Sequence, residues 1–242
     1  MQFKSIRSRA DAGVTMDVAE GHFAANHSHI NNYIDLTKVR THLFAARGAA
    51  EILAGFYEST LVEAILCLEN TDTIGALMAE ALSKSSFTGM NSDQDIAIVR
   101  PELNANNQMI FRGYAQEAVR GKNVLLLLSS ISTGKTVTRA YDCLKYYGAI
   151  LAGVCTVFSA LREIDGIPVN AVFTGADVQD YMTYPPETCA LCAAGRNLDA
   201  LAGIWTPSSI LTGILNYKKR APLAPALACI VYAFTSSTVP SV

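Results

Sequence analysis

A hydroxyl-rich turn follows a run of apolar residues near the middle of the chain, in "VLLLLSSISTGKTV" at 124–137. Small residues there leave backbone N–H groups open where a helix should begin, and the helix dipole favours an anion. A nucleotide-triphosphatase loop is excluded, because its pattern needs a glycine where Ser129 stands. The residues expected to bind phosphate are Ser129, Ser130, Ile131, Ser132, Thr133, Gly134, Lys135 and Thr136. A serine-rich turn without a ligand is the alternative.

The elements around this turn alternate between strands and helices. Continuous apolar runs predict strands, and apolar residues at helical spacing predict helices. This alternation is typical of a doubly wound α/β protein with a parallel sheet, which binds ligands at the carboxyl ends of its strands. The first 25 residues are polar and small, with no clear period. Strands are expected at 61–69, 95–100, 123–128, 149–160 and 169–174, and helices at 35–57, 70–84 and 135–148.

The amino-acid composition favours some classes of protein and argues against others. The chain has 242 residues, of which 50% are hydrophobic and 17% charged, and its net charge is −2. This balance predicts a well-packed globular protein and argues against a nucleic-acid partner, which requires a basic excess. No apolar stretch is long enough for a membrane helix, no secretory signal is visible, and reduced thiols are expected, so we expect a cytoplasmic protein.

The turn and its preceding strand resemble the signature of type I phosphoribosyltransferases. In that family an apolar run, two acidic residues and a hydroxyl-rich turn bind the ribose 5-phosphate of phosphoribosyl pyrophosphate (PRPP). The apolar positions and the turn match here. Only the acidic pair of the signature has no match here, because Leu128 and Ser129 occupy its two positions. The family's acids accept hydrogen bonds from the ribose hydroxyls and support a positively charged transition state, and losing each contact costs about 1.5–3 kcal/mol.

Further segments resemble the orotate phosphoribosyltransferase branch. "NNYID" resembles its N-terminal hood, "ENTDTIG" its pyrophosphate loop, and "IVRPE" the start of its mobile catalytic loop, where Pro101 replaces a lysine. "LREIDG" resembles the segment whose arginine binds the base, with Leu161 in place of an aspartate. Unpaired solvated arginines are the alternative reading of both arginines. The residues implied are Asn70, Thr71, Asp72 and Thr73 for pyrophosphate, Arg100 and Glu102 for catalysis, and Arg162 for the base.

The resemblance implies a type I phosphoribosyltransferase fold, with a twisted, mainly parallel sheet, helices on both faces and an N-terminal hood. We expect a hood segment at 1–60, a core at 61–205 and an extension at 206–242. The implied function is binding of PRPP or a nucleoside monophosphate, and transfer of phosphoribose to an orotate-like base with release of pyrophosphate. Mg²⁺ bound with PRPP and a homodimer are implied by the same resemblance. The alternative is a non-catalytic nucleotide-binding regulatory protein.

The "CALC" segment places Cys189 and Cys192 at the spacing of half a tetrahedral zinc site. A redox pair, a zinc ion shared across a dimer, and two thiols packed at a helix start are the alternatives, and a structural role is the expectation. His27 and His29 in "HSH" are read as surface residues, because no carboxylate or thiol is near in sequence. "CALC" followed by Gly and Asp-Ala-Leu also resembles a bacterial subgroup of orotate-transferase-like proteins.

Overall fold

The computed structural model describes residues 2–25, 27–84, 89–105 and 108–202. Packing divides the chain into two compact units, the first made of residues 1–20 and 34–181 and the second of residues 21–33 and 182–242. The expected extension at 206–242 lies outside the described residues. In the part of the chain that is described, no helix has the length and apolar character needed to cross a membrane.

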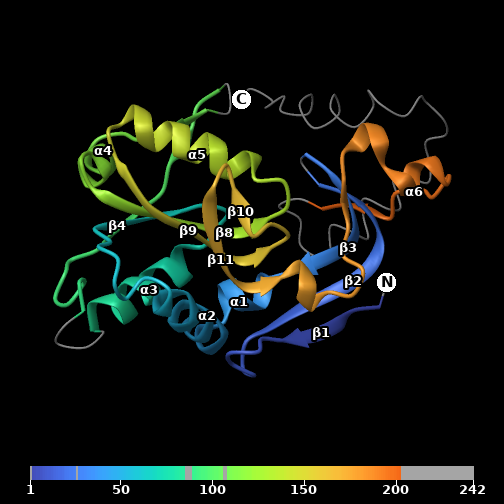
Figure 1. Cartoon of the computed structure of the whole chain (residues 1–242), viewed down its shortest axis with the longest axis horizontal. Coiled ribbons are helices and arrows are strands. Elements are labelled where there is room, and N and C mark those ends of the chain that lie inside the picture. The colour runs from blue at the N-terminus through green and yellow to red at the C-terminus, as the bar shows by residue number, and fades with distance from the viewer. Residues whose placement is uncertain (1, 26, 85–88, 106–107, 203–242) are drawn as a thin grey trace, which may run out of the picture. The chain divides into compact units, whose positions relative to one another are not determined.

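A six-stranded sheet forms the centre of the first unit (Figure 1). Neighbouring strands are parallel except at one edge, where the short β10 pairs antiparallel with β11. Every strand expected for this sheet is present, so the prediction of a mainly parallel α/β sheet is confirmed. The order is β10 (Glu163–Ile164), β11 (Ile167–Thr174), β9 (Ile150–Ser159), β8 (Asn123–Ile131), β4 (Ala64–Cys67) and β5 (Ala97–Val99).

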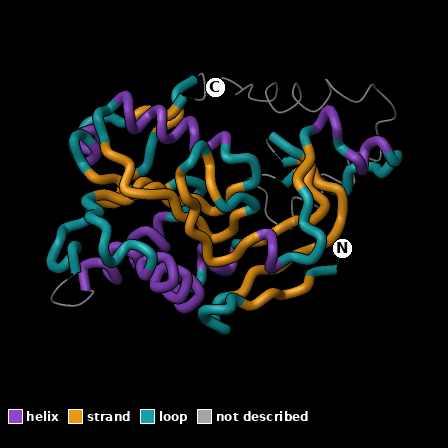
Figure 2. The backbone as a smooth tube through the Cα atoms, in the orientation of Figure 1, coloured by secondary structure: helices purple, strands orange, loops and turns teal. Residues whose placement is uncertain are grey.

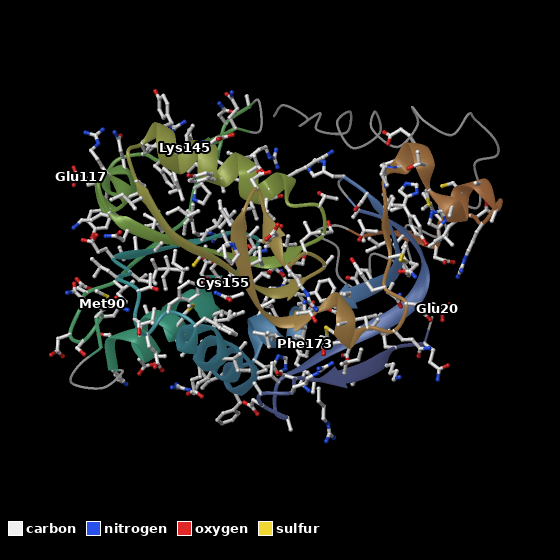
Figure 3. All side chains as sticks on the ribbon, viewed as in Figure 1. Glu20, Met90, Glu117, Lys145, Cys155 and Phe173 are labelled. Carbon is white, nitrogen blue, oxygen red and sulfur yellow. The ribbon has the colours of Figure 1, made fainter. Side chains whose placement is uncertain are left out.

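Helices cover both faces of this sheet, because its strands bury side chains on both sides. Leu125 and Leu127 of β8 pack in one core cluster with α2 (Leu43–Gly55) and α3 (Asp72–Lys84). Leu126 and Leu128 pack in a second cluster with α4 (Tyr114–Val119) and α5 (Lys135–Tyr146). Figure 2 shows the strands between these two layers of helices. In Figure 3, Cys155 of β9 lies within the packed interior, and its side chain is fully buried.

The helix expected at 35–57 is two helices, α1 (Thr37–Thr41) and α2. His42 separates them with an extended backbone, at ψ 124°. The Asp35 carboxylate accepts a hydrogen bond of 2.8 Å from the Thr37 N–H, which satisfies a donor at the start of α1. The helix expected at 70–84 begins at Asp72, where a negative side chain interacts favourably with the helix dipole.

The N-terminal residues are strands, although the sequence shows no clear period there. β1 (Lys4–Arg7) pairs antiparallel with β2 (Thr15–Ala24), and Val14, Met16 and Val18 are buried in the first core cluster. The pattern is weak because buried glycine, alanine and histidine share β2 with the larger apolar residues. A two-stranded hairpin of β6 (Glu102–Leu103) and β7 (Met109–Ile110) follows β5.

The second unit is built on a hairpin. The end of β2 and the start of β3 (His29–Asp35) are joined by a turn in which the Ala25 N–H donates to the Ser28 carbonyl at 2.7 Å. Two short strands from the far end of the chain extend this hairpin: β12 (Thr183–Tyr184) pairs with β3, and β13 (Ala200–Leu201) pairs with β2. Between them lie a 3-10 turn at Pro186–Thr188 and the short helix α6 (Ala190–Ala193).

Candidate functional site

The predicted binding segments meet at one edge of the six-stranded sheet. Each of them follows the carboxyl end of a parallel strand: 70–73 after β4, Arg100 after β5, 132–134 after β8 and Arg162 after β9. Hydrogen bonds link the segments, since the Ala160 N–H donates to the Ile131 carbonyl at 2.8 Å. The edge where doubly wound proteins bind ligands therefore carries the residues that the sequence singled out.

The turn after β8 is an open helix N-terminus. β8 runs on through Ser129, Ser130 and Ile131, and α5 begins at Lys135. Gly134 caps the helix with a left-handed φ of 78°, and no side chain caps the first turn. A Cβ at Gly134 would lie 3.1 Å from Ile164 of β10, so a side chain here would strain the backbone and crowd Ile164. The first-turn N–H groups of α5 therefore have no side-chain acceptor from the N-cap residue, and helix N-termini of this kind favour anions.

Glu69 supplies a carboxylate beside this turn, a contact that the sequence did not indicate. Its Oε2 accepts a hydrogen bond of 3.1 Å from the Ser130 N–H. Desolvation by the surrounding protein raises the pKa of the Glu69 carboxyl, while backbone hydrogen bonds from Ser130 and Ser129 and the charge of Arg40 oppose that rise. The residue keeps an exposed surface, so a ligand can reach it.

The loop before α3 is held in a strained conformation. Glu69 and Asn70 have φ of 56° and 61°, a region that non-glycine residues rarely adopt. The Arg40 guanidinium donates to the Glu69 carbonyl at 3.1 Å, and Arg100 donates to Asn70 Oδ1 at the same distance. Such strain persists only where the surroundings hold it, and it is common at ligand sites.

The residues of this loop and of the adjoining strand end differ in whether their side chains support the loop or lie together at its surface. Arg100 Nε lies 3.2 Å from Asp72 Oδ1, so the arginine bridges β5 and the start of α3. The Thr71 hydroxyl is fully buried and donates to the Leu68 carbonyl at 2.8 Å, which makes it part of the loop's internal support. Thr73 lies in the first turn of α3. Asn70, Asp72 and Arg100 are thus the side chains that the structure brings together here.

Glu102, the second predicted catalytic residue, lies on the β6–β7 hairpin. It is exposed and forms an ion pair with Arg112, at 3.3 Å between Nε and Oε2. Arg112 follows β7, so this ion pair lies at the hairpin. Arg162 is also exposed, and its carbonyl accepts a hydrogen bond from the Val169 N–H at 2.9 Å, which holds it at the start of the β10–β11 hairpin.

The two positions of the family's acidic pair face different ways. Leu128 is fully buried in the second core cluster, among side chains of α5. Ser129 is 6% exposed on the opposite face of β8. The β8 strand therefore offers no carboxylate of its own, and Glu69 is the acid that is hydrogen-bonded to its end. A hollow of about 650 Å³ lined by Tyr146 and Tyr147 lies at the opposite end of α5, away from the anion site.

Cys189 and Cys192 lie in the second unit, and they do not stand alone. Cys189 precedes α6 and Cys192 lies on it, with their sulfurs 3.5 and 3.6 Å from Nε2 of His22. His29 completes the group, and its Nδ1 lies 3.1 Å from His22 Nε2 and 3.3 Å from Cys192 Sγ. The reading of His29 as a surface residue is wrong, because it is only 9% exposed. His27 is half-buried and outside this cluster.

Sequence comparison finds relatives among phosphoribosyltransferases. No model of a known protein family matches the chain. Orotate phosphoribosyltransferases of Chlorobium phaeobacteroides and Chlorobaculum parvum are each 25% identical to it over 183 residues, which is 75% of this chain and 86% of theirs. The transcriptional regulator GfcR of Methanocorpusculum labreanum is 23% identical over 145 residues, 59% of this chain and 71% of its own.

Structure comparison returns proteins of the same kind. Orotate phosphoribosyltransferase of Mycobacterium tuberculosis H37Rv matches with a TM-score of 0.47 at 17% identity, over 66% of this chain and 90% of its own. UMP synthase of Leishmania donovani matches with a TM-score of 0.48 at 16% identity, over 66% of this chain and 34% of its own. The curated relatives and the sheet confirm the resemblance to the type I phosphoribosyltransferase family, and to its orotate phosphoribosyltransferases, that the sequence motifs predict.

Proposed function

We propose that this chain binds PRPP or a nucleoside monophosphate at the edge of its parallel sheet, and transfers phosphoribose to an orotate-like base. The observation that carries the proposal is the open N-terminus of α5 at Gly134, directly after the strand that matches the family signature. A phosphate there would accept hydrogen bonds from the N–H groups of residues 132–136, with hydroxyls of Ser132, Thr133 and Thr136 and the charge of Lys135 nearby.

The pyrophosphate of PRPP would lie at residues 70–73, beside Arg100. Mg²⁺ fits this place, because Asn70 Oδ1 and the Asp72 carboxylate are oxygen ligands of the kind the ion prefers. Both oxygens are held by Arg100, so the ion would be bound mainly through substrate oxygens and water. Bound in this way, Mg²⁺ would neutralise charge on the departing pyrophosphate.

Glu69 is the residue we assign to the ribose. Its carboxylate lies at the Ser130 N–H, the end of β8 where the family's acids would be. A carboxylate at this point accepts hydrogen bonds from ribose hydroxyls and stabilises positive charge that develops on the sugar ring. Arg162, after β9, would bind an acidic base through a charge-assisted hydrogen bond. We further expect a homodimer, on resemblance alone, and a mass measurement in solution checks it.

The experiment is a transfer assay paired with calorimetry. The full chain with Mg²⁺ is titrated with PRPP and with nucleoside monophosphates, and pyrophosphate release is then measured over a panel of bases including orotate. Binding with pyrophosphate release supports the proposal. Binding without release from any base would instead identify the non-catalytic alternative, which the two curated transferases do not favour. No heat with any of these ligands would reject both.

A further inference from the structure

We propose that His22, His29, Cys189 and Cys192 form a structural zinc site in the second unit of the chain. Their four ligand atoms lie within 4.8 Å of one another. The site is separate from the phosphate site and does not depend on the function proposed above. It unites the cysteine pair, whose spacing is that of half a tetrahedral zinc site, with two histidines from a hairpin far away in sequence.

Four of the six distances between the ligand atoms are close to those around a tetrahedral zinc ion. With Zn–N of about 2.05 Å and Zn–S of about 2.3 Å, tetrahedral angles separate two nitrogens by about 3.3 Å and a nitrogen from a sulfur by about 3.6 Å. The two ring nitrogens here are 3.1 Å apart. Three of the four nitrogen–sulfur distances are 3.3, 3.5 and 3.6 Å, and all four ligand atoms lie within 4.8 Å of one another. The cluster therefore has dimensions close to those of a tetrahedral zinc site.

A contact outside the cluster fixes which nitrogen of His22 faces the metal. Nδ1 of His22 lies 2.8 Å from the carbonyl oxygen of Arg196. Since a carbonyl can only accept, Nδ1 must carry the proton, and the lone pair of the neutral ring is on Nε2. Nε2 is the atom that faces His29 and both sulfurs. Histidine ligands of zinc are commonly oriented in this way by a backbone carbonyl.

Hydrogen bonds among the four side chains explain their arrangement less well than a bound metal ion does. Nε2 of His22 has one lone pair, yet three potential partners crowd around it. Cys192 is exposed, but His22 is fully buried, and His29 and Cys189 are 9% and 2% exposed, so water does not readily satisfy these three groups. The five described cysteines form no disulfide with one another. One cation in the centre would satisfy all four ligand atoms at once.

Among its described residues, the second unit buries few large apolar side chains, such as Phe23, Ile30 and Tyr33. Neither of the two core clusters includes a residue of 21–33 or 182–202. Its described secondary structure is a hairpin, two strands of two residues each and a helix of four residues. Small units of this kind are commonly held together by a metal or by disulfides.

The ligand set identifies the metal and its role. Two thiolates and two imidazoles in a tetrahedron are typical of zinc, and the two thiolate charges balance the 2+ of the ion. Binding releases the two thiol protons and leaves the imidazoles neutral. All four positions are taken by side chains, so no position is open for water or substrate, and the ion ties β2, β3 and α6 together rather than doing chemistry.

The first test uses the unmodified full chain, produced in zinc-supplemented medium and purified without chelators. We expect one zinc per chain by elemental analysis. X-ray absorption should show equal numbers of sulfur ligands at about 2.3 Å and nitrogen ligands at about 2.05 Å. Absence of stoichiometric zinc from protein with reduced thiols, a Cys189–Cys192 disulfide in peptide mass spectra, or an oxygen-rich ligand shell would overturn the proposal.

Variants then assign the ligands. Zinc content should fall well below one per chain in Cys192→Ser and in His22→Ala, and should stay at one in Cys143→Ser and His27→Ala. Cys143 is a half-buried thiol of the first unit and His27 is a neighbouring histidine outside the cluster, so both control for the chemistry of the change. Full zinc in Cys192→Ser would reject the assignment. If a variant fails to fold, the X-ray absorption spectrum of the unmodified chain still tests the proposed set of two sulfur and two nitrogen ligands.

Discussion

Glu69 Oε2 accepts a hydrogen bond from the backbone N–H of Ser130 at 3.1 Å, which places a carboxylate at the strand end that has lost its own acids. The two residues come from neighbouring parallel strands, β4 and β8, and their contact depends on the left-handed backbone of Glu69. A carboxylate can therefore be supplied to the ribose position from a different strand.

Glu69→Gln tests this relationship in the presence of ligand. Glutamine keeps an oxygen that can accept from the Ser130 N–H but removes the charge. Loss of charge-assisted contacts to ribose should weaken PRPP binding about tenfold, measured by calorimetry. Unchanged affinity would show that the carboxylate does not contact the ribose.

The same variant has a predicted effect on stability without ligand. Desolvation raises the pKa of the Glu69 carboxyl in the folded protein, so its charged form opposes folding at neutral pH. Glu69→Gln should therefore be more stable than the unmodified chain above the raised pKa. The difference should shrink as the pH falls through that pKa, and should vanish below the unfolded value near 4.5. Urea denaturation at a series of pH values measures this.

Glu63 should behave in the opposite way. Hydrogen bonds from Lys122 and from the backbone and side chain of Asn123 lower the pKa of Glu63 to about 2. Because this carboxylate favours folding when charged, Glu63→Gln should lose about 1 kcal/mol of unfolding free energy at neutral pH, a value reduced for its partial exposure. The loss should disappear as the pH falls from 4.5 toward 2. Glu117→Gln, at an exposed position on α4, is the control, and an equal loss there would contradict the prediction.

Leu128→Asp should destabilise the protein rather than restore an acid to the site. The side chain is fully buried among apolar residues of the second core cluster. An uncompensated buried charge costs about 3–5 kcal/mol of unfolding free energy. Leu103→Asp, at a position 60% exposed, should cost far less in the same denaturation series. Restoring catalytic charge is better attempted with Ser129→Asp in the Glu69→Gln background, which avoids two adjacent carboxylates.

The sequence predicts the parallel sheet well and the second unit poorly, for physical reasons. Strands such as β8 are buried on both faces, so an unbroken apolar run identifies them. β2 mixes small and polar residues with apolar ones, and its pairing with β13 comes from residues far along the chain. Binding segments at strand ends follow from the parallel arrangement alone. The Glu69 contact does not, because it depends on a strained backbone.

The cluster of two histidines and two cysteines is also a feature that the sequence does not predict. Cys189 and His22 are 167 residues apart, and His22 lies in a strand that carries no motif. The available signal was the cysteine pair itself, since half a tetrahedral site requires two more ligands from elsewhere in the chain. The chain has four histidines, and nothing in their spacing separates His22 and His29 from the other two.

Comparing Gly134→Ala with Gly148→Ala distinguishes an effect on phosphate binding from the stability cost of placing alanine at a left-handed φ. Gly134 and Gly148 flank α5 with φ of 78° and 74°, so alanine at either position should cost about 1–2 kcal/mol of unfolding free energy. A Cβ at Gly148 meets nothing within 4 Å, whereas one at Gly134 meets Ile164 at 3.1 Å and lies at the first turn of the helix. Both variants should therefore lose stability in urea, but only Gly134→Ala should weaken nucleoside monophosphate binding in calorimetry. Equal affinity in the two variants would mean that the phosphate is not held at the N-terminus of α5.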